Sequence, residues 1–473
     1  MSEKIESQVA LKDDTESSVQ ANSFTEDCSV KNKISKNKKW FILLIVALQG
    51  FLGPLTSSIY VPAIDQVRQS FNASNTSINA TISLYVFIMG LAPLLWASLS
   101  ERHGRRTVYL LATILYVGST IGCALSNSVG LFIALRAIQA VGASAAQAVG
   151  AGTITDLFDV HERGNAMGLF LLGPLVGPVV GPIAGGFINE YMNWQFIFWF
   201  LSAMGGLIFI FILFFLPETS VLILKRRALA KQVKETGTTV VQGTLQKQND
   251  GKETFLESMA RPFKFITKPL VIIATTPYSM AYGFMYFVIA SLPHQLSIHY
   301  QFSSYQIGLS YLANGIGNAL GAFISGKLSD RQLNKYSQIN EKRTHLEARL
   351  PPMWIGIVLL PVGELVYGWC IQLNVHVMAS LTGLFLLGLG VGFVQTPCNT
   401  YIVDSYQQHS ASVMSVANLM RCISAGCTPL IAPTLIDQIG NGWSMTILAI
   451  LSLLSGICIF LVQKYGERWR QPM

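Results

Sequence analysis

Long apolar stretches, separated by short polar segments, make up most of the chain. Twelve of these stretches are about twenty residues long, the length at which a helix crosses the hydrocarbon core of a bilayer. Because lipid offers no partners to backbone N–H and C=O groups, we expect each stretch to be an α-helix. The expected spans are residues 40–62, 78–99, 107–126, 129–152, 166–188, 194–216, 270–293, 305–326, 352–372, 376–400, 411–436 and 443–463.

Polar segments divide these spans into two sets of six. Residues 1–39 are rich in Ser, Lys, Asp and Glu without an apolar run, so we expect a disordered cytoplasmic tail. Residues 217–269 are the expected cytoplasmic central loop and residues 464–473 a cytoplasmic C-terminal tail. The predicted fold is an all-α membrane protein with an N-terminal six-helix half, residues 40–216, and a C-terminal six-helix half, residues 270–463.

The composition agrees with a membrane protein that is not an enzyme. Only 12% of the residues are charged and the mean hydropathy is +0.44, whereas soluble proteins carry about 25% charged residues. The net charge of +8 is interpreted as loops beside an anionic leaflet rather than as a nucleic-acid site. The seven cysteines show no metal or disulfide spacing, the histidines are scattered, and no G-x-x-x-x-G-K-S/T loop occurs. We therefore expect a transporter driven by an ion gradient, with no cofactor and no metal.

Charge placement predicts the orientation of the spans. If the N-terminus is cytoplasmic, 30 of the 33 Lys and Arg residues lie on the cytoplasmic side, as the positive-inside rule requires. The exceptions are Arg68 in an outside loop and Arg136 and Arg421 inside spans. Three N-glycosylation sequons fall in or beside the first outside loop, and they begin at Asn72, Asn75 and Asn79.

One short sequence occurs in both halves, 229 residues apart. Residues 97–102 read A-S-L-S-E-R and residues 326–331 read G-K-L-S-D-R, each after the second span of its half. Parallel six-span halves that rock around a midplane cavity have this kind of repeat.

An acid at a helix end can pair with Arg and with the dipole of a neighbouring helix. An ion pair that breaks during rocking would favour one conformation, although the segment could also be a basic loop that only sets topology. The candidate gating residues are Glu101, Arg102, Gly104, Arg105, Arg106, Asp156, Asp330, Arg331 and Asp404.

The fifth span combines regularly spaced glycines with prolines. Prolines remove backbone donors and bend a helix, and glycines four residues apart let a neighbouring helix approach closely. This pattern suits a helix at an interface where helices slide past each other. It also suits a kinked helix whose only role is tight packing. The residues are Gly173, Pro174, Gly177, Pro178, Gly181, Pro182, Gly185 and Gly186.

These motifs give the chain a family resemblance. Residues 97–106 are similar to the pattern G-x-L-S-D-R-x-G-R-R, with Ala97 and Glu101 as departures, and Arg136 and Gln139 match R-x-x-Q-G-x-G in the fourth span. The fifth span is similar to the antiporter motif G-x-x-x-G-P-x-x-G-G. Residues 40–465 thus resemble fungal twelve-span drug:proton antiporters of the major facilitator superfamily, and most of all the quinidine-resistance-like branch. The resemblance implies the major facilitator fold and multidrug export.

Charged residues inside spans are candidates for transport and coupling. Burying a charge at the bilayer centre costs about 2.5–3.5 kcal/mol on insertion scales, so such residues are usually functional. Arg136 has Gln139 one turn away, Glu364 lies in the ninth span and Arg421 in the eleventh. A desolvated carboxylate such as Glu364 could carry the coupling proton, or it could pair structurally, and Arg421 could bind only backbone carbonyls. The first span has no acid before Asp65, so Asp156 and Asp404 are alternative proton sites, although their positions at the cytoplasmic ends of spans four and ten favour helix-end ion pairs instead.

Aromatic and amide side chains within the spans are candidates for a cargo cavity, because such groups suit amphiphilic organic molecules. The set is Gln49, Tyr60, Tyr85, Gln139, Gln147, Tyr282, Tyr286, Asn314, Asn318, Gln395, Asn399 and Asn418. We expect a monomer in the bilayer that exports drugs and other amphiphilic compounds by alternating access, with protons as the coupling ion. The plasma membrane is the expected location, with the vacuolar membrane as the alternative. Export of a metabolite, and a non-transporting membrane sensor, are the alternative functions.

The orientation can be tested with an impermeant thiol reagent. A single cysteine near Val233, in the expected central loop, should stay unlabelled in intact cells and become labelled after permeabilisation, because the basic segments face the cytoplasm. Labelling from outside intact cells would overturn the predicted topology.

Overall fold

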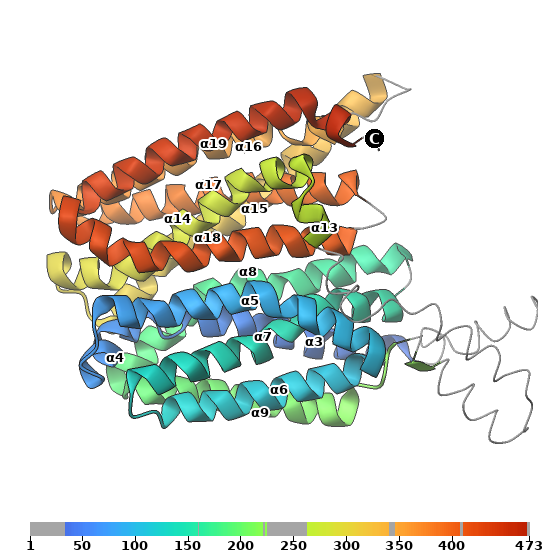
Figure 1. Ribbon diagram of the computed structural model, residues 1–473, viewed down its shortest axis with the longest axis horizontal. Helices are drawn as coiled ribbons and strands as arrows, with labels where there is room; N and C mark the ends of the chain where they lie inside the picture. The colour runs from blue at the N-terminus through green and yellow to red at the C-terminus, as the bar shows by residue number, and fades with distance from the viewer. Residues whose placement is uncertain are drawn as a thin grey trace, which may run out of the picture.

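The computed structural model describes residues 34–158, 160–220, 223–224, 263–339, 346–406 and 410–470, and within these ranges the regular structure is helical. Figure 1 shows long helices that run roughly side by side. The predicted tail up to residue 33 and most of the predicted central loop lie outside the described residues.

The described residues of the N-terminal half form six long helices and two short ones. Its elements are α3 Lys36–Ser58, η1 Val61–Ala63, α4 Ile64–Ser70, α5 Asn75–His103, α6 Arg105–Ala124, α7 Val129–Leu157, α8 Val160–Tyr191 and α9 Trp194–Phe215.

The C-terminal half repeats this plan. Its elements are α13 Phe263–Ile266, α14 Pro269–Tyr300, α15 Ser304–Ile339, η2 Leu346–Arg349, α16 Pro352–Gln372, α17 Val377–Ser405, α18 Ser410–Ile439 and α19 Asn441–Arg470.

The all-α membrane fold predicted from hydropathy is confirmed. Among the described residues, eleven helices are long and apolar enough to cross a bilayer. The remaining expected span, residues 166–188, lies on the 32-residue helix α8, which runs alongside the others in Figure 1.

Several helices differ from the expected spans at their ends. The first expected span ran without a break to residue 62, but α3 ends at Ser58 and gives way to η1 and α4, where Pro62 lacks the N–H of a regular helix. Helix α19 continues to Arg470 through most of the segment expected as a tail. A helix outside lipid keeps its backbone hydrogen bonds, so it can extend beyond the apolar run that hydropathy detects.

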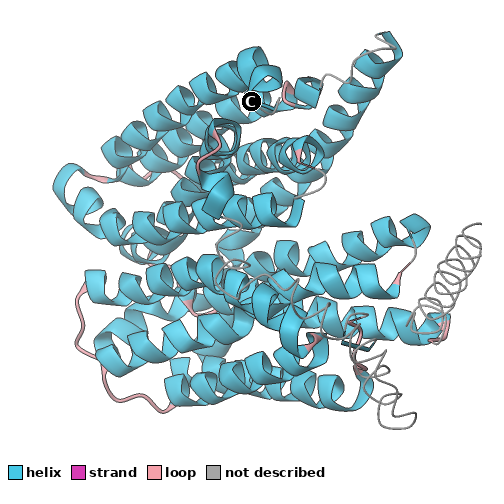
Figure 2. Cartoon of the chain, turned by 45° about the vertical axis from the view of Figure 1, so that its right-hand side comes forward, coloured by secondary structure: helices cyan, strands magenta, loops and turns pink. Residues whose placement is uncertain are grey.

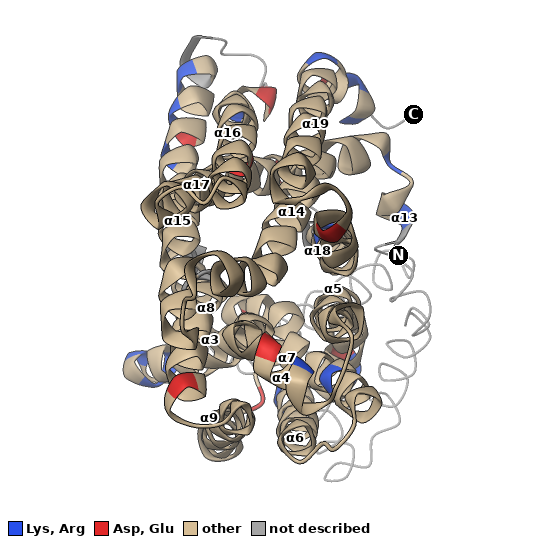
Figure 3. Ribbon diagram, turned by 90° about the vertical axis from the view of Figure 1, so that its left-hand side faces the viewer, with Lys and Arg blue, Asp and Glu red and all other residues tan. Residues whose placement is uncertain are grey.

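The two halves meet along two pairs of helices. Figure 3, viewed along the bundle, shows α5 beside α18 and α8 beside α15 at the boundary between the halves. We call the end that carries Arg102, Arg105, Arg106 and Arg349 the basic end, and the end that carries η1 and α4 the opposite end. In Figure 2 the halves approach at the opposite end and diverge towards the basic end.

Polar contacts hold the halves together at the opposite end. The Asn189 amide donates to the Ser304 hydroxyl at 2.8 Å, and the Ser304 backbone N–H donates to the Glu190 carboxylate at 3.0 Å. His294 Nδ1 also lies 3.8 Å from Asp65 Oδ1. These contacts join α8 and α4 of one half to α15 and α14 of the other.

The position of Asn79 argues against glycosylation there. Asn79 lies on α5 and is 6% exposed, and its amide donates to the Pro429 carbonyl of α18 at 3.0 Å. A glycan would break this contact between the halves, so the folded structure disfavours modification of Asn79. Asn72 is exposed, Asn75 is half-buried, and modification of these two stays a prediction.

The glycines of α8 allow close packing against α3. A Cβ added at Gly173 would lie 2.9 Å from the Ala47 carbonyl oxygen, and one added at Gly177 would lie 2.9 Å from the Leu55 nitrogen. A Cβ at Gly185 would overlap the Ile59 carbonyl. The glycine face therefore packs within the N-terminal half, as small residues do where helices approach closely in membranes.

Replacing Gly185 with Ala should destabilise the protein, because the methyl group would meet the backbone of Ile59, directly after α3, rather than a movable side chain. Overpacking of this kind typically costs about 1–3 kcal/mol. The melting temperature of the detergent-solubilised protein, followed by size-exclusion chromatography, measures the effect. Gly168→Ala on the same helix is the control, since no atom lies within 4 Å of its Cβ position. Equal melting temperatures would contradict the packing argument.

Candidate functional site

A cavity of about 540 Å³ lies within the C-terminal half and at its boundary with α8. Helices α14, α15, α17 and α18 contribute most of its wall, and the proline face of α8 and Arg349 of η2 contribute the rest. Its lining combines amides, hydroxyls and aromatic rings with apolar side chains such as Met285 and Ile289, the mixture found in sites for organic ligands.

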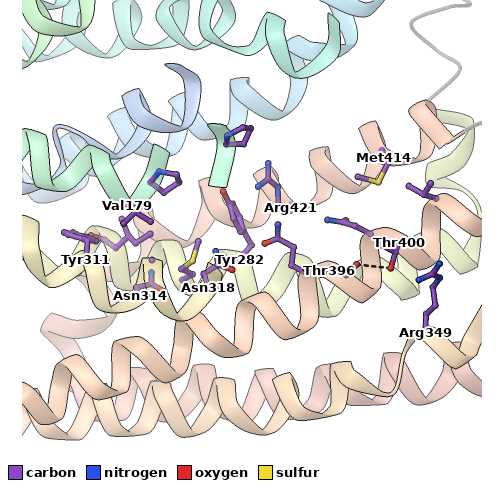
Figure 4. A pocket seen from close by; sticks show the side chains of 18 of the residues that line it. Val179, Tyr282, Tyr311, Asn314, Asn318, Arg349, Thr396, Thr400, Met414 and Arg421 are labelled. Atoms are coloured by element: carbon purple, nitrogen blue, oxygen red, sulfur yellow. Dashed lines mark hydrogen bonds between the residues drawn. The ribbon is translucent and has the colours of Figure 1, made fainter. Parts of the chain in front are cut away.

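The cavity extends to the basic end. Figure 4 shows Tyr311 at one end of the lining and Arg349 at the other, with Tyr282 and Arg421 between them. Asp330 and Asp404 also line the cavity. Since these residues lie at the basic end and the halves contact each other at the opposite end, the cavity is accessible from the basic end.

The structure brings together only part of the predicted cavity set. The lining includes the candidates Tyr282, Asn314, Asn318, Gln395 and Asn399, together with Arg421 and the motif residues Pro174 and Pro178. The candidates that do not line this cavity are Gln49, Tyr60, Tyr85, Gln139, Gln147, Tyr286 and Asn418. Hydropathy could not separate the two groups, because membrane helices bury polar residues both in cavities and between packed helices.

Arg421 is the cation in the middle of the cavity. It projects from α18, and its Cζ lies 4.2 Å from the centroid of the Tyr282 ring on α14. Its Nη2 donates to the side-chain oxygen of Asn418 one turn earlier. Arg421 therefore bonds a side-chain amide and an aromatic face, rather than only the backbone carbonyls considered above.

Arg136 lies apart from the cavity, in the core of the N-terminal half. It is fully buried, with its Cζ 4.4 Å from the Tyr60 ring centroid and 4.3 Å from that of Tyr85. Its Nη1 donates to Gln139 Oε1 at 2.8 Å and to the Thr56 carbonyl at 3.2 Å. Aromatic faces and neutral oxygens thus hold this charge, and the predicted pairing with Gln139 is present.

Glu364 is also separate from the cavity. It is fully buried on α16, and the Ser452 hydroxyl of α19 lies 3.2 Å from each of its carboxyl oxygens. One neutral hydroxyl does not compensate a buried negative charge, so the site suits a group that can accept a proton.

The basic end of the N-terminal half contains an ion pair between α6 and α7. Arg105 Nε lies 3.4 Å from Asp156 Oδ2, and Arg105 Nη1 donates to the Ser100 hydroxyl at 2.7 Å. Gly104 has a φ of +96°, which favours glycine, and the Arg105 backbone N–H donates to Glu218 at 2.9 Å. Side chains from three helix ends are thereby connected.

The C-terminal half contains the same kind of ion pair, built on an arginine that sequence reasoning missed. Arg349 Nη1 donates to Asp330 Oδ1 at 2.6 Å, and Arg349 Nε lies 2.6 Å from Asp404 Oδ2. The prediction singled out Arg331, which is exposed on α15. Arg349 lies in a separate segment, η2, and its distance from the motif in the sequence is the reason that it was missed. The equivalent positions of Asp404 and Asp156 in the two halves could have indicated that Asp404 needs an arginine partner, as Asp156 does.

Each of these ion pairs lies inside one half. Arg105 and Asp156 both belong to the N-terminal half, and Arg349 bridges two aspartates of the C-terminal half. In this conformation the pairs therefore brace the basic end of each half separately and do not join the two halves.

Comparison with known proteins identifies the family. The family described as Major Facilitator Superfamily matches residues 46–427 and 348–473. "Efflux pump radE" of Floropilus chiversii is 33% identical over 437 residues, which cover 92% of this chain and 81% of that protein. "MFS-type transporter penM" of Penicillium rubens is 34% identical over 427 residues, covering 90% and 84%. The solved xylose transporter XylE from E. coli aligns with a TM-score of 0.66 at 15% identity, covering 91% and 98%.

The chain belongs to the Major Facilitator Superfamily and is a membrane transporter of that fold.

Replacing Arg349 with Ala should destabilise the basic end of the C-terminal half, because Asp330 and Asp404 would lose their common partner. The expected loss is about 1–2 kcal/mol, between the values for exposed and buried pairs. A melting curve of the purified protein measures it.

Arg331→Ala removes the same charge from an exposed position two turns before the end of α15 and should leave the melting temperature unchanged. Adding Asp404→Asn to Arg349→Ala should recover part of the loss, because one unpaired carboxylate is then neutral. Equal effects of the two arginine substitutions would show that the pairs contribute nothing specific.

Proposed function

We propose that this transporter exports amphiphilic organic compounds from the cytoplasm by alternating access, driven by proton antiport. The single observation that carries the proposal is the cavity of about 540 Å³ that reaches the basic end. By the positive-inside rule the basic end faces the cytoplasm, so the described conformation would take up cargo from that side.

The contacts between the halves support the alternating-access step. Asn189, Glu190 and Ser304 join α8 to α15 at the opposite end, and breaking a few such hydrogen bonds would let the halves separate there. Rocking of two six-helix halves about a central site is the general mechanism of this architecture. The glycine face of α8 on α3 lets α8 move together with its own half.

The lining supports an amphiphilic cargo. Tyr282, Met285 and Ile289 offer apolar and aromatic surface, while Asn314 and Gln395 offer amide groups. The volume suits a ligand of drug size. The relative named an efflux pump agrees with export, and the plasma membrane is the proposed location. Multidrug substrates of the quinidine type are part of the same proposal.

Proton coupling is proposed on the buried carboxyl group of Glu364, with Asp156 and Asp404 as alternatives. Glu364 is fully buried, the Ser452 hydroxyl is its hydrogen-bond partner among the described residues, and α16 and α19 pack closely around it. Asp156 and Asp404 instead pair with arginines of their own halves. Glu364 is therefore the better candidate for a group that gains and loses a proton.

Reconstituted liposomes with an imposed pH gradient test the antiport. At least one member of a panel of fluorescent amphiphiles, which includes a cationic, a neutral and an anionic dye, should accumulate against its gradient only while the pH gradient persists. Quinidine is added as an unlabelled competitor. Equal flux with and without the gradient would indicate a facilitator, as in the alternative in which the protein transports a metabolite. If no member of the panel is transported, a different cargo or a non-transporting sensor would be favoured.

Glu364→Gln tests the proton site separately. The amide keeps the size of the side chain and a partner for Ser452 but cannot carry a proton, so gradient-driven accumulation should fall at least about tenfold while downhill exchange persists. Ser452→Ala is the matched variant, because it removes the hydrogen bond and keeps the carboxyl group. Unchanged gradient-driven accumulation in Glu364→Gln would keep antiport and transfer the role to Asp156 or Asp404.

A further inference from the structure

The cavity contains a guanidinium group that has no acidic partner. Arg421 lines the cavity, and its described contacts are Asn418, Cys422 and the face of Tyr282. Among the described residues no carboxylate forms an ion pair with it. A cation within a membrane protein is costly unless it is compensated, and here the compensation comes only from neutral groups.

The carboxylates that line the cavity are already paired. Asp330 and Asp404 each lie 2.6 Å from Arg349, and Figure 4 places Arg349 at the far end of the lining from Tyr311. The other lining residues are neutral. The part of the cavity around Tyr282 and Arg421 therefore carries a positive charge, which disfavours a cationic ligand there.

Neutral residues form the wall further along the cavity. Asn314, Asn318 and Asn399 line it, but their side-chain oxygens are buried against protein atoms and do not face a ligand. Met285 and Ile289 provide apolar surface on the same wall.

We propose that the cavity binds amphiphilic weak acids in their anionic form, with the acid group paired to Arg421 and the apolar body against Met285 and Ile289. The planar guanidinium can bond both oxygens of a carboxylate. Such a pair is stronger in a cavity with apolar walls than in water. The substrate class follows from this arrangement: an organic anion with an apolar or aromatic body.

This inference rests on the proposed role of the cavity as the cargo site, and binding tests it without any need for transport. Three probes share one fluorescent body: dansylglycine is an anion, its methyl ester is neutral, and mono-dansylated ethylenediamine is a cation. Their binding is measured with the full-length protein in phosphatidylcholine nanodiscs, which contain no anionic lipid, and empty nanodiscs give the background. Dansylglycine should bind about tenfold or more tightly than the ester, and the cation should bind most weakly.

Substitution of Arg421 distinguishes the pair from general hydrophobic binding. Arg421→Gln should weaken dansylglycine binding about tenfold and leave the ester within about twofold. Arg421→Lys retains the charge and should keep the preference for the anion over the ester. Arg468→Gln is the control, because Arg468 is exposed on α19 and does not line the cavity. A size-exclusion profile confirms that each variant is folded.

Two results would overturn the assignment. One is equal affinity of the wild-type protein for the three probes or a preference for the cation, and this result does not depend on any variant. The other is an equal loss of binding affinity for dansylglycine and for its ester in the Arg421→Gln variant.

A different measurement, the flux across a membrane, tests the proposed export function. Anion-selective binding that depends on Arg421, together with flux that ignores the pH gradient, would overturn antiport and keep the anion site. Gradient-driven flux of cationic and anionic probes at equal rates would keep antiport and overturn the anion site.

Discussion

The cost of a charge within the bilayer is the constraint on which the interior of this transporter depends. Two arginines lie inside the spans, and each half meets the cost differently. The N-terminal half encloses Arg136 between the rings of Tyr60 and Tyr85 and bonds it to Gln139. The C-terminal half holds Arg421 against Tyr282 and leaves it at the wall of the cavity. The N-terminal arginine is thus a packed element of its half, whereas the C-terminal one is accessible to a ligand.

Helix α8 contacts both halves of the transporter. Its glycines, such as Gly177, pack on α3, while Pro174 and Pro178 face the cavity of the other half. Further along, a Cβ at Gly186 would lie 2.5 Å from the Ser304 carbonyl oxygen of α15. One helix therefore packs tightly within its own half, lines the cavity and contacts the other half at the opposite end. This threefold use explains why the fifth span carries the densest pattern of glycine and proline in the chain.

The two halves also stabilise their basic ends by the same interaction. In each half an arginine pairs with the aspartate that ends the fourth long helix, Asp156 or Asp404. Arg105 comes directly after the motif of the first half, and Arg349 comes from a separate segment in the second. The two halves therefore contain the same kind of ion pair, but the arginine comes from a different part of the sequence in each half. These ion pairs brace the basic end of each half and do not cross the boundary between the halves.

Hydropathy and charge alone determined that the chain is an all-helical membrane protein, and the repeat and motifs predicted the two six-helix halves of the Major Facilitator Superfamily. The physical reason is that lipid imposes one solution on the backbone, so an apolar run of sufficient length specifies a helix without reference to its neighbours. The sequence also identified Arg421, Asn314 and Gln395 as candidate functional residues, because burying polar groups within spans costs free energy. Only the tertiary structure decided that Arg421 lines a cavity while Arg136 and Glu364 do not, and that Arg349 rather than Arg331 holds Asp330 and Asp404. Those outcomes depend on which faces of distant helices meet, and the periodicity of a single helix carries no information about that.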